Sequence, residues 1–197
     1  MGSVNTHWRE FLGSGDEKSF SIIYNYHVDD LFSYGISLGF QKDACKDALQ
    51  DTFYKLYLSK EKLHHVENIT AYLFKTFKHS LIDLNRKNRS VENIESYTES
   101  FPIQVSILDD MIDMENSELI RKKVETLLNS LTPNQREVVY LKYMTGLQHR
   151  EIAEVLGINE ESARKLLYRA MEKLRKHASA ENLPEKLLLF TLLSLLQ

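Results

Sequence analysis

The sequence predicts an all-α protein made of two small helical domains that are joined by an acidic linker. Apolar residues recur at helical spacing along most of the chain, whereas strand-like alternation is rare. Only three prolines and seven glycines interrupt the 197 residues. Charged residues are segregated into basic, acidic and basic segments, although the net charge is only -3. This order predicts two nucleic-acid surfaces with an acidic linker between them.

The composition is that of an ordinary globular protein, with 43% hydrophobic and 27% charged residues. The one cysteine, Cys45, excludes an internal disulfide and a cysteine-based zinc cluster, and it is typical of a reducing compartment. The N-terminus lacks the basic-then-apolar pattern of a signal peptide, and no apolar stretch reaches the ~20 residues of a membrane helix. We therefore expect a cytoplasmic protein without membrane insertion.

The first domain is predicted over residues 1–90 and ends in a long helix from about Thr70 to Lys87. Residues 71–90 hold five cations against one anion. Cations interleaved with aromatic rings are typical of single-stranded DNA binding, by phosphate neutralisation and base stacking, although a solvated helix face explains the pattern equally well. The apolar side chains spaced to face a core are Leu73, Phe74, Phe77, Leu81 and Leu84.

The segment 91–117 is predicted to be an acidic linker. Residues 91–119 contain eight acidic side chains and no cation, and their apolar residues show little periodicity. The run Asp109, Asp110, Asp113 and Glu115 could be imagined as a magnesium site. Because it has no histidine partner and no surrounding fold, a solvated linker is favoured and no metal is expected.

The second domain is predicted over residues 118–177, with four helices. Thr132 and Pro133 begin one helix, as cap and first helical residue. Gly157 ends a later one, and Asn159 caps the next only two residues on. This last helix buries one face and is basic on the other, so the pair forms a helix-turn-helix. The buried face is formed by Ala163, Leu167, Ala170, Met171 and Leu174.

In a helix-turn-helix the N-terminal residues of the second helix meet base edges in the major groove. A glutamate there can accept from cytosine N4, and Arg164 and Lys165 can donate to guanine or to phosphate. Glu160 and Glu161 also suit the positive end of the helix dipole, so capping and base contact both remain open for them. A plain helical hairpin in a core is the alternative for the motif as a whole. The candidate DNA-reading residues are Glu160, Glu161, Ser162, Arg164, Lys165, Tyr168 and Arg169.

The order of these segments resembles bacterial RNA polymerase sigma factors of the extracytoplasmic-function (ECF) group, within the sigma-70 family. The likeness runs from Trp8 to about Lys176. It is carried by "WREFLGSGDEKSFSIIYNYHVDDLFSYG", by "DALQDTFYKLY", by "AYLFKTFKHSLIDLNRKNR" and by "LTPNQREVVYLKYMTGLQHREIAEVLGINEESARKLLYRAMEKLR". Each stretch by itself is modest evidence for the family, but the four stretches in this order are specific to it. Two departures are Leu166, where a basic residue is expected, and His79, where an asparagine is usual.

The resemblance implies a role for each segment. The second domain reads the minus-thirty-five promoter element, and the acidic linker threads the polymerase near the RNA path. The helix that holds "DALQDTFYKLY" docks on the clamp of the large polymerase subunit through Asp47, Gln50, Asp51 and Phe53, although a core position is favoured for Phe53. The residues implied to meet the opened minus-ten element are Lys75, Lys78, His79, Asn85 and Arg86, with His64 and His65 on a preceding loop that captures a flipped base.

The segment 178–197 lies beyond the resemblance and has an apolar tail, "LPEKLLLFTLLSLLQ". We expect a short helix packed on one of the domains; a surface for a regulator or a lid over the DNA-reading face is the alternative.

The function expected is therefore that of a sigma factor, with core RNA polymerase and promoter DNA as partners and an anti-sigma factor left open. A stand-alone helix-turn-helix regulator is the alternative. The sequence contains no nucleophile with a base at motif spacing, no phosphate loop and no metal-ligand cluster, so we expect no enzyme, no cofactor and no small-molecule substrate.

Overall fold

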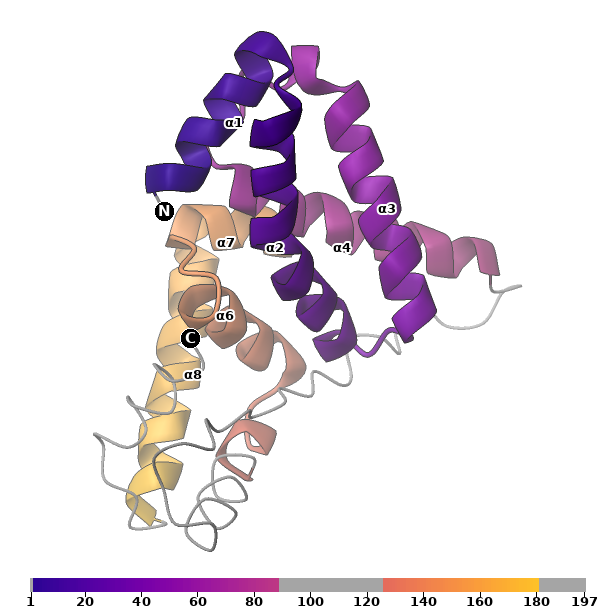
Figure 1. Ribbon diagram of the computed structural model, residues 1–197. Helices are drawn as coiled ribbons and strands as arrows, with labels where there is room; N and C mark the ends of the chain where they lie inside the picture. Colours follow the sequence, from indigo (N-terminus) through magenta and orange to yellow (C-terminus); the bar gives the residue numbers. More distant parts are fainter. Residues whose placement is uncertain (1, 89–125, 181–197) are drawn as a thin grey trace, which may run out of the picture. The chain divides into compact units, whose positions relative to one another are not determined.

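The computed structural model describes residues 2–88 and 126–180, which fall largely into two compact helical units (Figure 1). No strand occurs within these two ranges, so the predicted all-α class is confirmed. The linker, the apolar tail and the acidic run at 109–115 lie outside the described residues. Among the residues that are described, no helix is both long and apolar enough to cross a bilayer.

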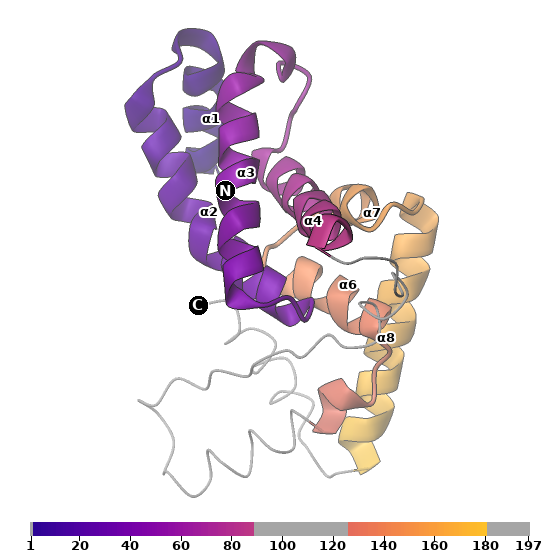
Figure 2. The ribbon, with the colours of Figure 1, turned by 90° about the vertical axis from the view of Figure 1, so that its right-hand side faces the viewer.

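The first unit packs three helices alongside one another and a fourth across them. Figures 1 and 2 show α4 running across α2 and α3, and α3 packs against both α2 and α4. The long helix predicted from Thr70 to Lys87 is confirmed to within a residue at each end. The elements are α1 (Gly2–Ser14), α2 (Glu17–Ser37), α3 (Lys42–Leu58), the short 3-10 helix η1 (Lys60–Lys62) and α4 (Ile69–Asn88).

Short polar side chains begin two of these helices. Asp16 precedes α2, and its Oδ2 accepts a hydrogen bond from the Ser19 backbone N–H at 2.8 Å. Asn68 precedes α4, and its Oδ1 accepts from the Ala71 N–H at 3.2 Å. Each cap satisfies an N–H that has no partner within its helix, which explains why the helices start where they do.

The core of the first unit contains several aromatic rings. Trp8, Phe11 and Phe74 are buried, and the ring of Tyr34 packs at a tilt of 56° against that of Phe74, with centroids 5.1 Å apart. Four of the five apolar side chains predicted to face the core from α4 are fully buried, while Leu84 is half-buried. The helix stripe read from the sequence therefore marks the inner face of α4, which leaves its other faces for solvent.

The second unit contains the helix-turn-helix. Its elements are α6 (Pro133–Tyr143), α7 (His149–Leu156) and α8 (Glu160–Ala180), and residues 126–129 are helical ahead of α6. α6 packs against α8. Thr132 and Gln135 form a reciprocal capping box, with the Thr132 N–H donating to Gln135 Oε1 at 3.0 Å. The predicted cap and first helical residue of α6 are thus confirmed.

The turn between α7 and α8 has the predicted chemistry. Gly157 ends α7 in a left-handed conformation, with φ of 67° and ψ of 31°. Asn159 Oδ1 accepts from the Ser162 N–H at 2.7 Å and so caps α8. The five small and apolar residues predicted to form the inner face of α8 are all buried. Since this face is turned inward, the side chains on the opposite side of α8 point toward solvent.

Candidate nucleic-acid interfaces

The first candidate interface is the outer face of α8. Arg164, Lys165 and Arg169 are exposed there, and Tyr168 keeps 65% of its surface accessible. A large aromatic side chain that is exposed and surrounded by cations is suited to contact a base or a sugar, while the cations contact phosphates. The structure therefore gathers on one face four of the seven residues predicted from the sequence.

The two glutamates at the start of α8 pair with cations one turn later. Glu160 bonds the guanidinium of Arg164, and Glu161 Oε1 lies 2.6 Å from Nζ of Lys165. A glutamate four residues ahead of a cation is the favourable orientation in a helix, worth about 0.2–0.5 kcal/mol. Ser162 is half-buried, and its backbone N–H is used by the cap. This pairing supplies the glutamates with a structural role and leaves base contact open.

The second candidate interface is the outer side of α4. Lys75, His79 and Arg86 are exposed along it, whereas Lys78 is half-buried and has an interaction of its own within the protein. The side chain of Asn85, also predicted for this surface, lies outside the described residues. An exposed row of two cations and an imidazole on one long helix can follow a phosphate backbone.

The loop between η1 and α4 has an inner and an outer side. Leu63 is buried, and the carbonyl oxygen of Val66 accepts a hydrogen bond from the indole of Trp8 at 2.9 Å. His64 and His65 are both exposed. The two predicted base-contacting histidines therefore face solvent from a loop whose other side is held against the core.

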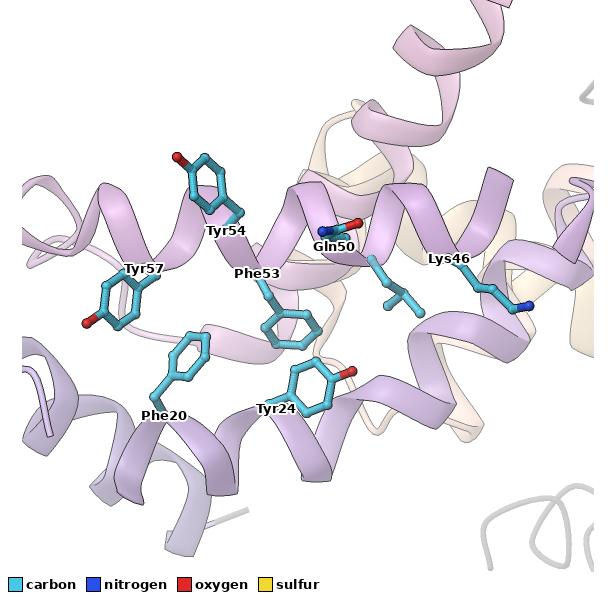
Figure 3. A pocket seen from close by; sticks show the side chains of 8 residues that line it. Phe20, Tyr24, Lys46, Gln50, Phe53, Tyr54 and Tyr57 are labelled. Carbon is cyan, nitrogen blue, oxygen red and sulfur yellow. The ribbon is translucent and has the colours of Figure 1, made fainter. Parts of the chain in front are cut away.

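An aromatic groove of about 450 Å³ lies between α2 and α3 (Figure 3). The rings of Tyr24 and Phe53 face each other across it with centroids 4.7 Å apart, and those of Phe20 and Tyr57 are 5.4 Å apart. Leu49, Gln50, Lys46 and Tyr54 complete the lining. An apolar floor with polar groups at its rim is typical of a protein-binding surface.

The four residues predicted to dock on the polymerase are divided by the fold. Asp47 and Gln50 are exposed, and Gln50 lines the groove. Phe53 is only 4% exposed, which agrees with the interpretation of this residue as core. Asp51 instead faces α4: its Oδ2 accepts a hydrogen bond from the Ser80 hydroxyl and lies 2.6 Å from Nζ of Lys55. The carboxylate of Asp51 thus ties α3 to α4.

Sequence reasoning missed the tyrosines of the groove. Tyr24, Tyr54 and Tyr57 are absent from the residues predicted to dock on the polymerase, yet all three line the groove, and Tyr24 is 39% exposed. The sequence signal is clearest for Tyr54, which directly follows Phe53 and therefore lies about 100° around the helix from it, outside the stripe of Leu49, Phe53 and Leu56. Tyrosine also suits a partly solvated apolar surface, because its ring is apolar and its hydroxyl can bond to water.

Comparison with known proteins matches both units. The family described as "Sigma-70, region 4" matches residues 121–174. The ECF RNA polymerase sigma factor SigM of Bacillus subtilis (strain 168) is 25% identical over 154 residues, which cover 78% of this chain and 91% of SigM. The ECF RNA polymerase sigma factor SigX of the same strain is 23% identical over 165 residues, covering 82% of this chain and 84% of SigX.

Two solved structures have a similar fold. CnrH, in complex with the cytosolic domain of CnrY, superposes with a TM-score of 0.57 at 22% identity, over 89% of this chain and 97% of CnrH. The sigma factor RpoE of Bartonella quintana, in complex with the anti-sigma factor NepR, gives a TM-score of 0.54 at 21% identity, over 82% and 98% of the two chains. The region 4 match and the sigma-factor relatives along most of the chain support the assignment of this protein to the ECF group of the sigma-70 family.

Proposed function

We propose that the chain is a promoter-specificity subunit: it binds core RNA polymerase and directs initiation by reading the minus-thirty-five and minus-ten elements. The observation that carries the proposal is the basic outer face of α8, which ends a helix-turn-helix within the sequence matched to sigma-70 region 4. A second basic helix, α4, lies in a separate unit, which suits a protein that reads two DNA elements. The subunit carries out no chemistry of its own and works in the cytoplasm, where polymerase and promoter meet.

The domain roles follow from this assignment. Residues 1–90 form the unit for the minus-ten element and the polymerase clamp, and 118–177 form the unit for the minus-thirty-five element. Residues 91–117 are the acidic linker and 178–197 the apolar tail. The exposed cations of each unit meet phosphates, and the start of α8 meets base edges.

The groove between α2 and α3 is the proposed contact with polymerase. Gln50 stands at its rim and Asp47 is exposed nearby on the same helix, while Phe53 supports the groove from beneath. Tyr24, Tyr54 and Tyr57 supply the exposed aromatic surface that protein interfaces favour. An anti-sigma factor is a further proposed partner, since both structural neighbours were solved with a partner protein and RpoE with an anti-sigma factor.

The proposal is tested by reconstitution with core RNA polymerase, followed by run-off transcription from a library of genomic fragments. We expect co-purification with the polymerase and transcripts that share an upstream and a downstream element. Tyr54→Ala should weaken polymerase binding, whereas Arg164→Ala should leave it unchanged, so the two variants control for each other. Binding to DNA fragments without any affinity for polymerase would instead establish a stand-alone helix-turn-helix regulator.

A further inference from the structure

A hydrogen bond ties the first helix to the loop before α4, and the proposed roles of the two units do not explain it. Trp8 is the single tryptophan of the chain and is 1% exposed. Its indole N–H donates to the carbonyl oxygen of Val66 at 2.9 Å, across 58 residues of sequence. A buried indole N–H needs a partner, and a loop carbonyl has no helical partner of its own. α1 therefore holds this loop near its middle.

The loop itself is built from consecutive tight turns. The Leu63 N–H donates to the Lys60 carbonyl at 3.1 Å, and the Val66 N–H donates to the Leu63 carbonyl at 2.9 Å. Leu63 is buried and Asn68 caps α4, so both ends of the stretch are anchored. The two exposed histidines lie within the second turn, directly before Val66. A shift of the Val66 carbonyl would therefore move both imidazoles.

A second contact joins α1 to the start of the same loop. Nζ of Lys60 lies 5.9 Å from the centroid of the Phe11 ring, within the range of a cation–π interaction. That contact fixes the position of Lys60 only loosely, because an ammonium can occupy a range of positions over a ring face. The bond from Trp8 depends on the direction of a single N–H, so it specifies where the loop stands.

We propose that Trp8 is a positioning residue which, through the Val66 carbonyl, sets the place of His64 and His65 for contact with an unpaired base of the minus-ten element. The inference rests on the proposed function, because base capture has meaning only for a chain that acts on opened promoters. Trp8 touches no DNA itself. Its effect on base preference is transmitted through the loop backbone.

The first test measures the loop without any DNA. Trp8→Phe keeps a large buried ring and removes the N–H donor. Hydrogen exchange should become about fivefold faster for the amides of Leu63 and Val66, as the loss of one ordinary hydrogen bond implies. Protection in α3 should stay unchanged. Tyr34→Phe is the matched control, since it also removes one polar group from a buried ring, and that ring packs on Phe74 of α4 rather than on the loop.

The second test measures base preference in transcription with core polymerase. Promoters that differ at single minus-ten positions are compared for the wild-type chain, Trp8→Phe, His64→Ala/His65→Ala and the triple variant. Trp8→Phe should lower discrimination at one position by about fivefold and leave upstream preference intact. In the double-histidine background, Trp8→Phe should have no further effect on discrimination, because both changes act through the same contact.

Each outcome decides the proposal. The proposal is overturned if Trp8→Phe lowers transcription equally from all promoter variants. It is also overturned if Trp8→Phe causes a further loss of discrimination in the double-histidine background. In either case Trp8 is only a core residue. Unchanged loop exchange in Trp8→Phe would overturn the proposal as well. If the wild-type chain drives no promoter-specific transcription, the proposed function fails and base positioning fails with it, whereas the exchange experiment still shows whether Trp8 holds the loop.

Discussion

At the scale of single residues, a buried histidine joins two helices of the first unit. The Nδ1–H of His27 donates to the Ile23 carbonyl at 2.8 Å, and its Nε2 accepts from the Thr70 hydroxyl at 2.9 Å. A carbonyl can only accept, so Nδ1 carries a proton, and in the neutral ring Nε2 accepts from the hydroxyl. Burial lowers the pKa of His27 below its ordinary value of 6.5, because a charged ring would lose its hydration there.

Acid should therefore destabilise the first unit through His27. Between the folded pKa and 6.5 the unfolded chain binds a proton that the folded chain does not, so stability is full above pH 6.5 and falls as pH drops below it. Each unit by which the pKa is lowered corresponds to about 1.4 kcal/mol. Urea unfolding at pH 7.5 and pH 5.5 measures the slope of the unfolding free energy against pH. His27→Gln should flatten it, and an identical slope in that variant would remove His27 as its source.

A second residue-scale prediction concerns Gly35, where three helices approach closely. A methyl group there would lie 2.7 Å from Sγ of Cys45 and 3.0 Å from a ring carbon of Phe77. Replacing a helical glycine by alanine usually gains up to about 1 kcal/mol, but overpacking a core costs about 1–3 kcal/mol. We expect Gly35→Ala to lower the free energy of unfolding, measured by urea titration.

Gly13→Ala is the control for Gly35→Ala, because no atom lies within 4 Å of the added methyl group at Gly13. It should be neutral or mildly stabilising. Cys45 offers a second readout beside Gly35. Burial raises the pKa of its thiol to about 11, so a thiol reagent at pH 8 should react slowly with the folded chain and faster with Gly35→Ala. Equal stabilisation by both substitutions would show that the helices simply move apart.

At the scale of elements, α8 allows the two roles of its first glutamate to be separated. Glu160 lies in the first turn and pairs with Arg164, so the structure already gives its carboxylate a partner. We expect Glu160→Gln to destabilise the helix by about 0.2–0.5 kcal/mol and to leave the upstream base preference unchanged. Thermal unfolding and DNA binding across single-base variants measure the two effects. A relaxed preference at one base pair would establish base contact instead.

Arg164→Ala should behave in the opposite way. Its guanidinium is exposed near the start of α8, where side chains of a helix-turn-helix reach base edges. Loss of a base contact should cost about 1–3 kcal/mol of binding and relax one base preference of the upstream element. Loss of a phosphate contact would weaken all sequences equally and reduce the salt dependence. DNA titrations at several salt concentrations distinguish these results, and uniform weakening would show that Arg164 does not read bases.

At the scale of the whole molecule, basic surfaces on separate units should contribute independently to promoter use. Lys75 is exposed on α4 of the first unit, and Arg164 on α8 of the second. Lys75→Ala should slow promoter opening and reduce its salt dependence, while Arg164→Ala acts on the upstream element. Since the two side chains lie on separate units, the free-energy changes of the double variant should add. Transcription with both single variants and the double variant measures this, and marked non-additivity would contradict independent action.

Local features of the fold could be read from the sequence because they depend on neighbours only a few residues away. The cap by Thr132, the left-handed Gly157 and the cap by Asn159 were all predicted, and each involves a backbone group within four residues. Helical spacing likewise identified the buried faces of α4 and α8. Charge segregation and motif order predicted the function class, because DNA-binding chemistry leaves a direct trace in composition.

Long-range partners were decided only by the tertiary structure. Helical spacing tells which side of α3 is apolar, but it does not tell that Asp51 meets Ser80 or that Phe53 closes a groove with Tyr24. It also does not reveal that Trp8 reaches Val66, 58 residues away. By itself the sequence determined the helices, their caps and the basic faces. Which helices lie side by side, and so which polar groups already have a partner within the fold, depends on how whole surfaces fit together in three dimensions.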